Sequence, residues 1–88
     1  AEAFGLNCEV HTTTMGLMDL ANVHVSCAIR NCEYFEYFVP EENFRFPLQC
    51  PLEILEGRIA VPEAPGIGGE IDWDGVDRMC VSHRVSSL

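Results

Sequence analysis

Two side chains of this protein have the types and the placement that proton transfer requires. His11 ends a short run at residues 7–11, and Glu36 lies late in a second run at residues 32–38. A neutral imidazole that a carboxylate holds in one orientation can take a proton from carbon. We therefore predict that His11 and Glu36 are catalytic. Two alternatives stay open, namely a buried, hydrogen-bonded histidine and a structural salt bridge.

An amphipathic helix between the two runs would bring these side chains together. Residues 16–30 carry apolar side chains three and four positions apart, which is the spacing of a helix with one apolar face. A strand, a helix and a second, parallel strand place both carboxyl ends at one edge of a sheet. Because side chains alternate along a strand, His11 and Glu36 should both point away from the helix. Adjacent strands lie about 4.8 Å apart, so both groups could reach one small ligand.

Three threonines follow His11 in the predicted turn from strand to helix. Hydroxyl groups at such a turn cap free backbone amides of the helix, and this is our interpretation of Thr14. Thr12 and Thr13 stand next to His11 at the same edge. We predict that they bind substrate, with capping as the alternative.

The second half of the chain combines loops with short regular elements. Prolines after residue 38 predict an irregular excursion over the carboxyl edge of the sheet. Apolar and polar residues then alternate on both sides of Gly57, which predicts a hairpin. Residues 61–72 are rich in proline and glycine and should form a shaped loop. Asp72 is placed to cap a short helix over residues 73–79.

The composition argues against several classes of partner. Fourteen acidic and five basic residues give a net charge of −9, which opposes binding to nucleic acid or to an anionic membrane. There is no apolar stretch of the roughly 20 residues that a membrane span requires. Five irregularly spaced cysteines are expected to be reduced thiols of a cytoplasmic protein. A zinc site at His24, Cys27 and Cys32 is the least favoured alternative because no closing ligand pair follows. We predict no metal ligand in this chain.

Four stretches of sequence carry a family resemblance: CEVHTT, LANVHVSCAIRNC, EYFEYF and GRIAVPEAPGIGGEID. In this order they resemble the C-terminal end of enolase-superfamily enzymes of the mandelate racemase and muconate-lactonising group. The resemblance implies an α/β fold, the C-terminal part of a modified TIM (β/α) barrel. Residues 1–48 would supply the last two strands and the helix between them. Residues 49–88 would supply the hairpin, loop and short helix that return to a capping domain.

The resemblance also implies an activity, in which the α-proton of a carboxylate substrate is removed and Mg²⁺ stabilises the resulting enediolate. His11 matches the family's general base or acid, and Glu36 matches a carboxylate that assists at the substrate carboxylate. Dehydration of a sugar acid is favoured, and racemisation is the other outcome. The Mg²⁺ ligands are expected on upstream strands that this chain does not contain. The 88 residues are thus expected to be an inactive part of a longer, homo-oligomeric enzyme.

A second hypothesis is a free-standing acidic α+β module that binds a protein and performs no catalysis. Its binding groove would be lined by Tyr34, Phe44 and Phe46. Cooperative unfolding of the isolated chain would favour this module, whereas aggregation would favour the barrel segment.

Overall fold

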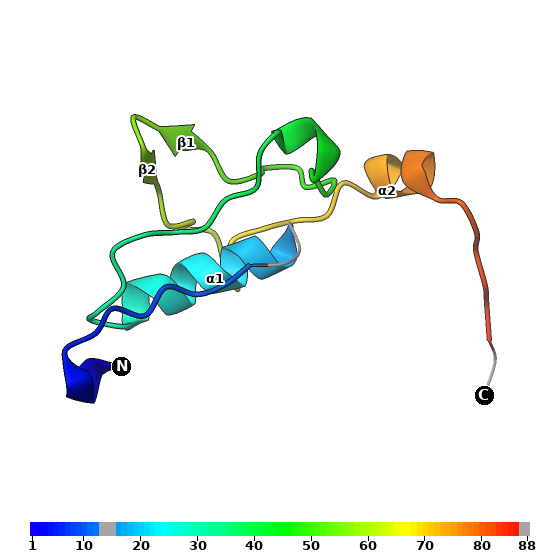
Figure 1. The fold of residues 1–88 in the computed structure, drawn as a ribbon. Helices are drawn as coiled ribbons and strands as arrows, with labels where there is room; N and C mark the ends of the chain where they lie inside the picture. The colour runs from blue at the N-terminus through cyan, green and yellow to red at the C-terminus, as the bar shows by residue number, and fades with distance from the viewer. Residues whose placement is uncertain (13–15, 87–88) are drawn as a thin grey trace.

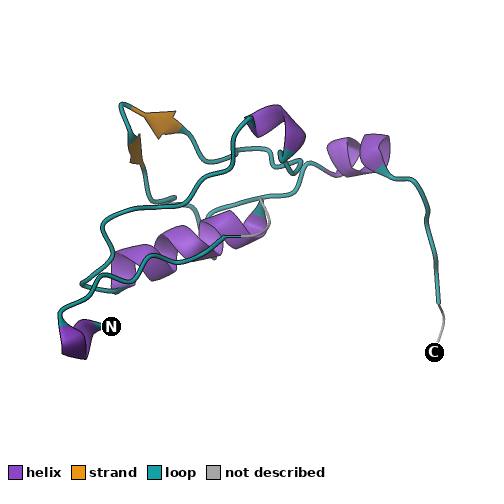
Figure 2. Cartoon of the chain, in the orientation of Figure 1, coloured by secondary structure: helices purple, strands orange, loops and turns teal. Residues whose placement is uncertain are grey.

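The regular elements of the chain are short and are separated by long loops (Figure 1 and Figure 2). The computed structural model describes residues 1–12 and 16–86. Within these ranges, none of the helices is long and apolar enough to cross a membrane. In chain order the elements are η1 (Glu2–Phe4), α1 (Leu17–Ala28), η2 (Glu41–Asn43), β1 (Ile54–Leu55), β2 (Arg58–Ile59) and α2 (Trp73–Met79).

Helix α1 confirms the amphipathic helix predicted for residues 16–30. At its start, the Gly16 N–H donates a hydrogen bond of 2.9 Å to Asp19 Oδ2. The Asp19 side chain thus pairs with a free backbone amide at this end of the helix, a role that we predicted for Thr14. Thr14 lies outside the described residues. Gly16 has a φ of 98°, and a Cβ there would lie 2.7 Å from the Cβ of Phe46. Both facts require glycine at this position.

The strands predicted at residues 7–11 and 32–38 are not β-strands in the structure. The two segments are extended and run side by side in the same direction next to α1 (Figure 1). The nearest backbone hydrogen bond in the described residues runs from Cys8 N to the carbonyl oxygen of Asn31, the residue before the second segment, at 2.8 Å. Parallel sheets occur almost only where helices or other elements cover both faces. Here α1 covers one side of the two segments. The segments lie next to each other, but in the described residues they do not form a β-ladder because their other side is uncovered.

The hairpin around Gly57 is confirmed. Strands β1 and β2 pair in antiparallel register, with Ile54 opposite Ile59 and Leu55 opposite Arg58. The connecting residues Glu56 and Gly57 have φ values of 52° and 72°. A type I′ turn requires positive φ at both central positions, and glycine supplies the second without strain.

The capped helix at residues 73–79 is also confirmed, as α2. Asp72 Oδ1 accepts a hydrogen bond of 3.1 Å from Gly75 N, and its Oδ2 forms an ion pair of 3.3 Å with Arg78. The loop before it is held by an isolated antiparallel bridge between Leu48 and Ile71. The proline- and glycine-rich stretch therefore returns to the excursion that follows residue 38.

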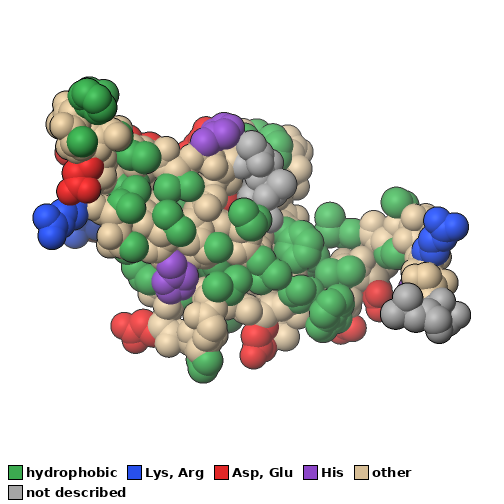
Figure 3. Space-filling model, turned by 90° about the horizontal axis from the view of Figure 1, so that it is seen from below, with side chains coloured by type: hydrophobic (Ala, Val, Ile, Leu, Met, Phe, Trp, Pro, Cys, Tyr) green, Lys and Arg blue, Asp and Glu red, His purple; other side chains and the backbone are tan. Residues whose placement is uncertain are grey.

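The chain buries little of its own apolar surface. In the described part, the buried hydrophobic side chains are Leu20, which is 1% exposed, and Val23, which is 3% exposed. The accessible surface is 7245 Å², against about 5,200 Å² for a compact protein of this mass. The radius of gyration is 15.6 Å, against about 12 Å for a compact domain of this length. Seen from the α1 side, hydrophobic side chains cover much of the surface (Figure 3).

Because so few side chains form the core, we expect Leu20→Ala to remove most of the stability of α1 packing. Truncating a buried leucine destabilises a protein by about 2–5 kcal/mol. Met18→Ala is the matched control, because Met18 lies on the same helix and is 56% exposed. Urea unfolding followed by the helical circular dichroism signal measures both. Equal losses in the two variants would show that α1 does not pack through Leu20.

Candidate active site

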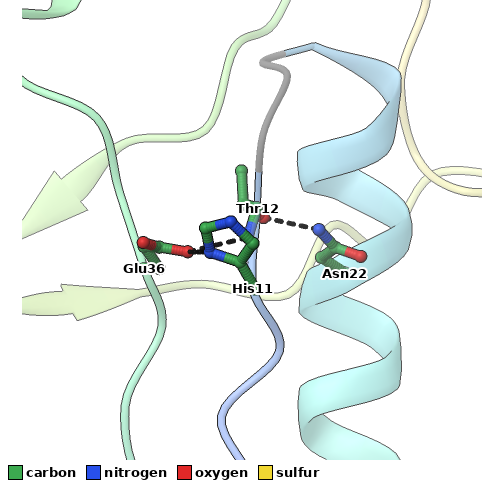
Figure 4. A network of polar contacts seen from close by, with 4 residues as sticks. All are labelled: His11, Thr12, Asn22 and Glu36. Carbon is green, nitrogen blue, oxygen red and sulfur yellow. Dashed lines mark hydrogen bonds and ion pairs between the residues drawn. The ribbon is translucent and has the colours of Figure 1, made fainter.

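His11 and Glu36 meet, as their placement in the sequence predicts. His11 Nδ1 lies 2.6 Å from Glu36 Oε2, and the two side chains approach each other from the two extended segments (Figure 4). Figure 4 shows the pair between the two segments, with α1 on the other side of the segment that carries His11 and Thr12. The side chains are 72% and 42% exposed, which excludes the buried histidine that the sequence left open. The contact itself fits a salt bridge as well as a catalytic pair, so the catalytic roles stay predictions.

A second donor holds the same carboxylate oxygen. The backbone N–H of Thr12 donates a hydrogen bond of 2.8 Å to Glu36 Oε2. This bond, followed by the one with His11, holds the pKa of Glu36 below its ordinary value of 4.5. Both donors favour the ionised form, and the opposing effect of desolvation is smaller. Glu36 is therefore a carboxylate at neutral pH.

The contact determines which nitrogen of His11 can act as a base. A carboxylate at Nδ1 makes this nitrogen the proton donor, so the lone pair of the neutral ring lies at Nε2. The same arrangement orients the general base of the serine protease triad. The geometry therefore gives His11 a basic nitrogen that its carboxylate partner does not occupy.

Thr12 has a structural partner that the sequence did not predict. Its side chain is 1% exposed, and its Oγ1 accepts a hydrogen bond of 2.5 Å from Asn22 Nδ2 of α1. The hydroxyl thus faces the helix, on the side opposite the His11 ring (Figure 4). Substrate contact by Thr12 stays a prediction, and Thr13 lies outside the described residues. By helical spacing, Asn22 lies on the side of the helix opposite the apolar face that the sequence predicts, so the apolar pattern gave no signal for it.

The described residues do not form the sites that the alternative hypotheses require. His24 Nε2 lies 3.2 Å from the carbonyl oxygen of Ile67. Within the part of the chain that is described, no group of three or more His, Cys, Asp or Glu residues could hold a metal ion. Tyr34 lines a hollow of about 540 Å³ beside α1 and the hairpin. Phe46 lines a different hollow, and Phe44 stacks on Phe38 with ring centroids 5.0 Å apart. The single groove proposed for a binding module is therefore not formed.

The chain therefore combines α/β secondary structure with an exposed histidine–carboxylate pair. Residues 1–75 match the enolase C-terminal domain-like family, and the chain belongs to this family. It is 32% identical over 78 residues to muconate cycloisomerase 1 of Rhodococcus opacus, in an alignment that covers 86% of this chain and 21% of that protein. The chain thus spans about a fifth of the length of this relative. No solved structure shows a significant match.

The two donors on Glu36 predict how its pKa responds to substitution. We expect nuclear magnetic resonance titration of its carboxyl carbon to give a value below 4.5 in the chain. In His11→Ala the pKa should rise only part of the way, because the Thr12 N–H is the larger cause. A full return to the ordinary value in this variant would show that Thr12 does not hold the carboxylate.

The same shift predicts how stability depends on pH. The folded chain holds the Glu36 pKa below 4.5, so it binds fewer protons at this site than the unfolded chain. The stabilisation is therefore present above the ordinary pKa and is lost as the pH falls through the lowered value. Urea unfolding at acidic and neutral pH should show a smaller acid-induced loss in Glu36→Gln than in the unmodified chain. An equal loss in both would contradict the assignment.

Proposed function

We propose that this chain supplies the histidine–carboxylate pair of an enolase-superfamily enzyme that removes the proton next to a substrate carboxylate. The observation that carries the proposal is the contact of 2.6 Å between His11 Nδ1 and Glu36 Oε2. Membership of the enolase C-terminal domain-like family supports it. The 72% exposure of the His11 side chain leaves the imidazole accessible to a ligand.

In the proposed reaction, the Nε2 lone pair of His11 takes the α-proton of the substrate. The C–H bond breaks, the proton forms an N–H bond, and the electron pair moves onto the substrate carboxylate. The imidazolium then carries a positive charge next to the carboxylate of Glu36, which stabilises it at a distance of 2.6 Å. The family resemblance implies a second role for Glu36 at the substrate carboxylate. Two ionised carboxylates repel each other, so this role requires a proton on Glu36 or a cation between the two groups.

Mg²⁺ would supply charge stabilisation for the enediolate, as such weak carbon acids require. The described residues do not fit a Mg²⁺ site by themselves. They contain no suitable cluster of side chains, and Glu36 Oε2 already accepts two hydrogen bonds. We propose that the carboxylate ligands for this ion lie on other strands of the enzyme.

The fate of the deprotonated substrate distinguishes three outcomes. Loss of water from a sugar acid is the outcome that we favour, and return of a proton to the opposite face would give racemisation. Cycloisomerisation is a further candidate, because the similar protein from Rhodococcus opacus is named a muconate cycloisomerase. Product analysis separates them. Dehydration lowers the mass by one water, racemisation changes only the configuration, and cycloisomerisation changes the bonding at constant mass.

The exposed apolar surface favours a barrel segment over a free-standing binding module. A module should bury its own core, but Leu20 and Val23 are the hydrophobic side chains buried in the described residues. We propose that the remaining strands of a longer polypeptide cover this surface. A sharp, cooperative melting transition of the isolated chain without aggregation would instead favour the module.

We expect His11→Asn to abolish exchange of the substrate α-proton with solvent deuterium in the complete enzyme. Asparagine can keep a hydrogen bond to Glu36 but has no basic nitrogen. The exchange rate is measured by proton resonance of the substrate in deuterium oxide. His24→Asn is the matched control, since His24 lies on α1 and contacts the Ile67 carbonyl. Undiminished exchange on both faces of the substrate in His11→Asn would remove His11 from the mechanism.

A further inference from the structure

We propose that Asn22 and Thr12 are positioning residues that hold the Glu36 carboxylate beside His11. The inference rests on the proposed function, because it concerns the same pair. It adds a role for α1, since Asn22 lies on this helix and contacts neither catalytic side chain in the described structure. The four residues form one line of polar contacts from the helix to the imidazole (Figure 4).

The first contact of this line lies in the interior. Asn22 is 9% exposed and Thr12 is 1% exposed, and the Asn22 amide donates to the Thr12 hydroxyl. Asn22 is flanked in the sequence of α1 by the buried residues Leu20 and Val23, and its side chain leaves the helix on a different side from theirs. A polar group in such a place is strongly destabilising unless it has a hydrogen-bond partner. The hydrogen bond to Asn22 therefore holds Thr12 at one position against α1.

The second contact joins Thr12 to the Glu36 carboxylate. Thr12 directs its side chain to α1, while its backbone N–H donates to Glu36 Oε2 at 2.8 Å. In the described residues no β-ladder joins the segments that carry Thr12 and Glu36. The other links between them lie nearer the start of each segment, at Glu9 with Glu33 and at Cys8 with Asn31. The Asn22 bond is the contact that fixes Thr12 itself against α1, and with it the donor for Glu36.

A purely structural role of the Asn22–Thr12 bond is the competing explanation. In this case its loss would loosen α1 without changing the ionisation of Glu36. If the bond positions the site, its loss moves the Thr12 N–H away from Oε2. The carboxylate then loses its strongest stabilising donor and its pKa rises toward 4.5. The two roles therefore predict different pKa values for Glu36 in such variants, and the pKa can be measured at its carboxyl carbon.

The first experiment titrates the Glu36 carboxyl carbon by nuclear magnetic resonance in four variants of the complete enzyme. Asn22→Leu removes the amide, and Thr12→Val removes the hydroxyl but keeps the backbone N–H and the shape of the side chain. Thr12→Ser keeps the hydroxyl. Ser26→Ala is the matched control one helical turn away, because Ser26 Oγ is buried without a hydrogen-bond partner among the described residues. We expect the Glu36 pKa to rise in the first two variants and to stay unchanged in the other two.

The second experiment uses the complete enzyme. Misplacement of a reacting group by about 1 Å can lower a rate by about 100-fold, so Asn22→Leu should lower kcat by up to this factor with little change in KM. A loss of α1 packing alone would change the stability of the enzyme without this separation of kcat from KM. Ser26→Ala should keep the unmodified kcat and KM.

The outcomes separate this inference from the proposed function. An unchanged Glu36 pKa in both Asn22→Leu and Thr12→Val, with the helical signal of α1 retained, would overturn the positioning role whatever the activity. If Asn22→Leu unfolds the chain, Thr12→Val decides alone, since it leaves the helix sequence intact. The proposed function is decided separately by proton exchange in His11→Asn, which does not depend on Asn22.

Discussion

One carboxylate oxygen holds together the two extended segments that carry the site, between which the described residues form no β-ladder. Oε2 of Glu36 accepts hydrogen bonds from the His11 ring and from the Thr12 backbone. Hydrogen bonds to an ionised acceptor are about twice as strong as neutral ones, but an ion pair as exposed as this one is weakened by water. The second hydrogen bond comes from the backbone of Thr12, a residue that is 1% exposed, so water weakens it less than it weakens the exposed pair.

The shortage of buried apolar surface is the second constraint. An accessible surface of 7245 Å² and a radius of gyration of 15.6 Å describe a chain that is open on several sides. Coverage of these sides by further protein would also exclude water from the site. In a less polar environment the attraction between an imidazolium and a carboxylate increases. The same packing that would complete the fold would thus strengthen the pair.

The elements that could be predicted from the sequence are those that local chemistry determines. Asp72 caps α2 because its carboxylate is within reach of an amide three residues later, and Gly57 forms a turn that few other residues tolerate. The prediction of strands at residues 7–11 and 32–38 was wrong. Parallel pairing depends on neighbouring strands and on cover over both faces of the sheet, and a short stretch of sequence carries no information about either. The alternation of side chains in the two segments still placed His11 and Glu36 on one side, since alternation requires only an extended backbone.

The role of Thr12 shows where the sequence argument fell short. The alternation that directs residues 8 and 10 toward the helix also directs the Thr12 side chain there, yet its place beside His11 suggested a substrate contact. The structure separates two parts of one residue: the hydroxyl binds Asn22 and the backbone N–H binds Glu36. A backbone donor cannot be removed by changing a side chain. A side chain can change this backbone contact only by moving the backbone, and Asn22 is placed to do so.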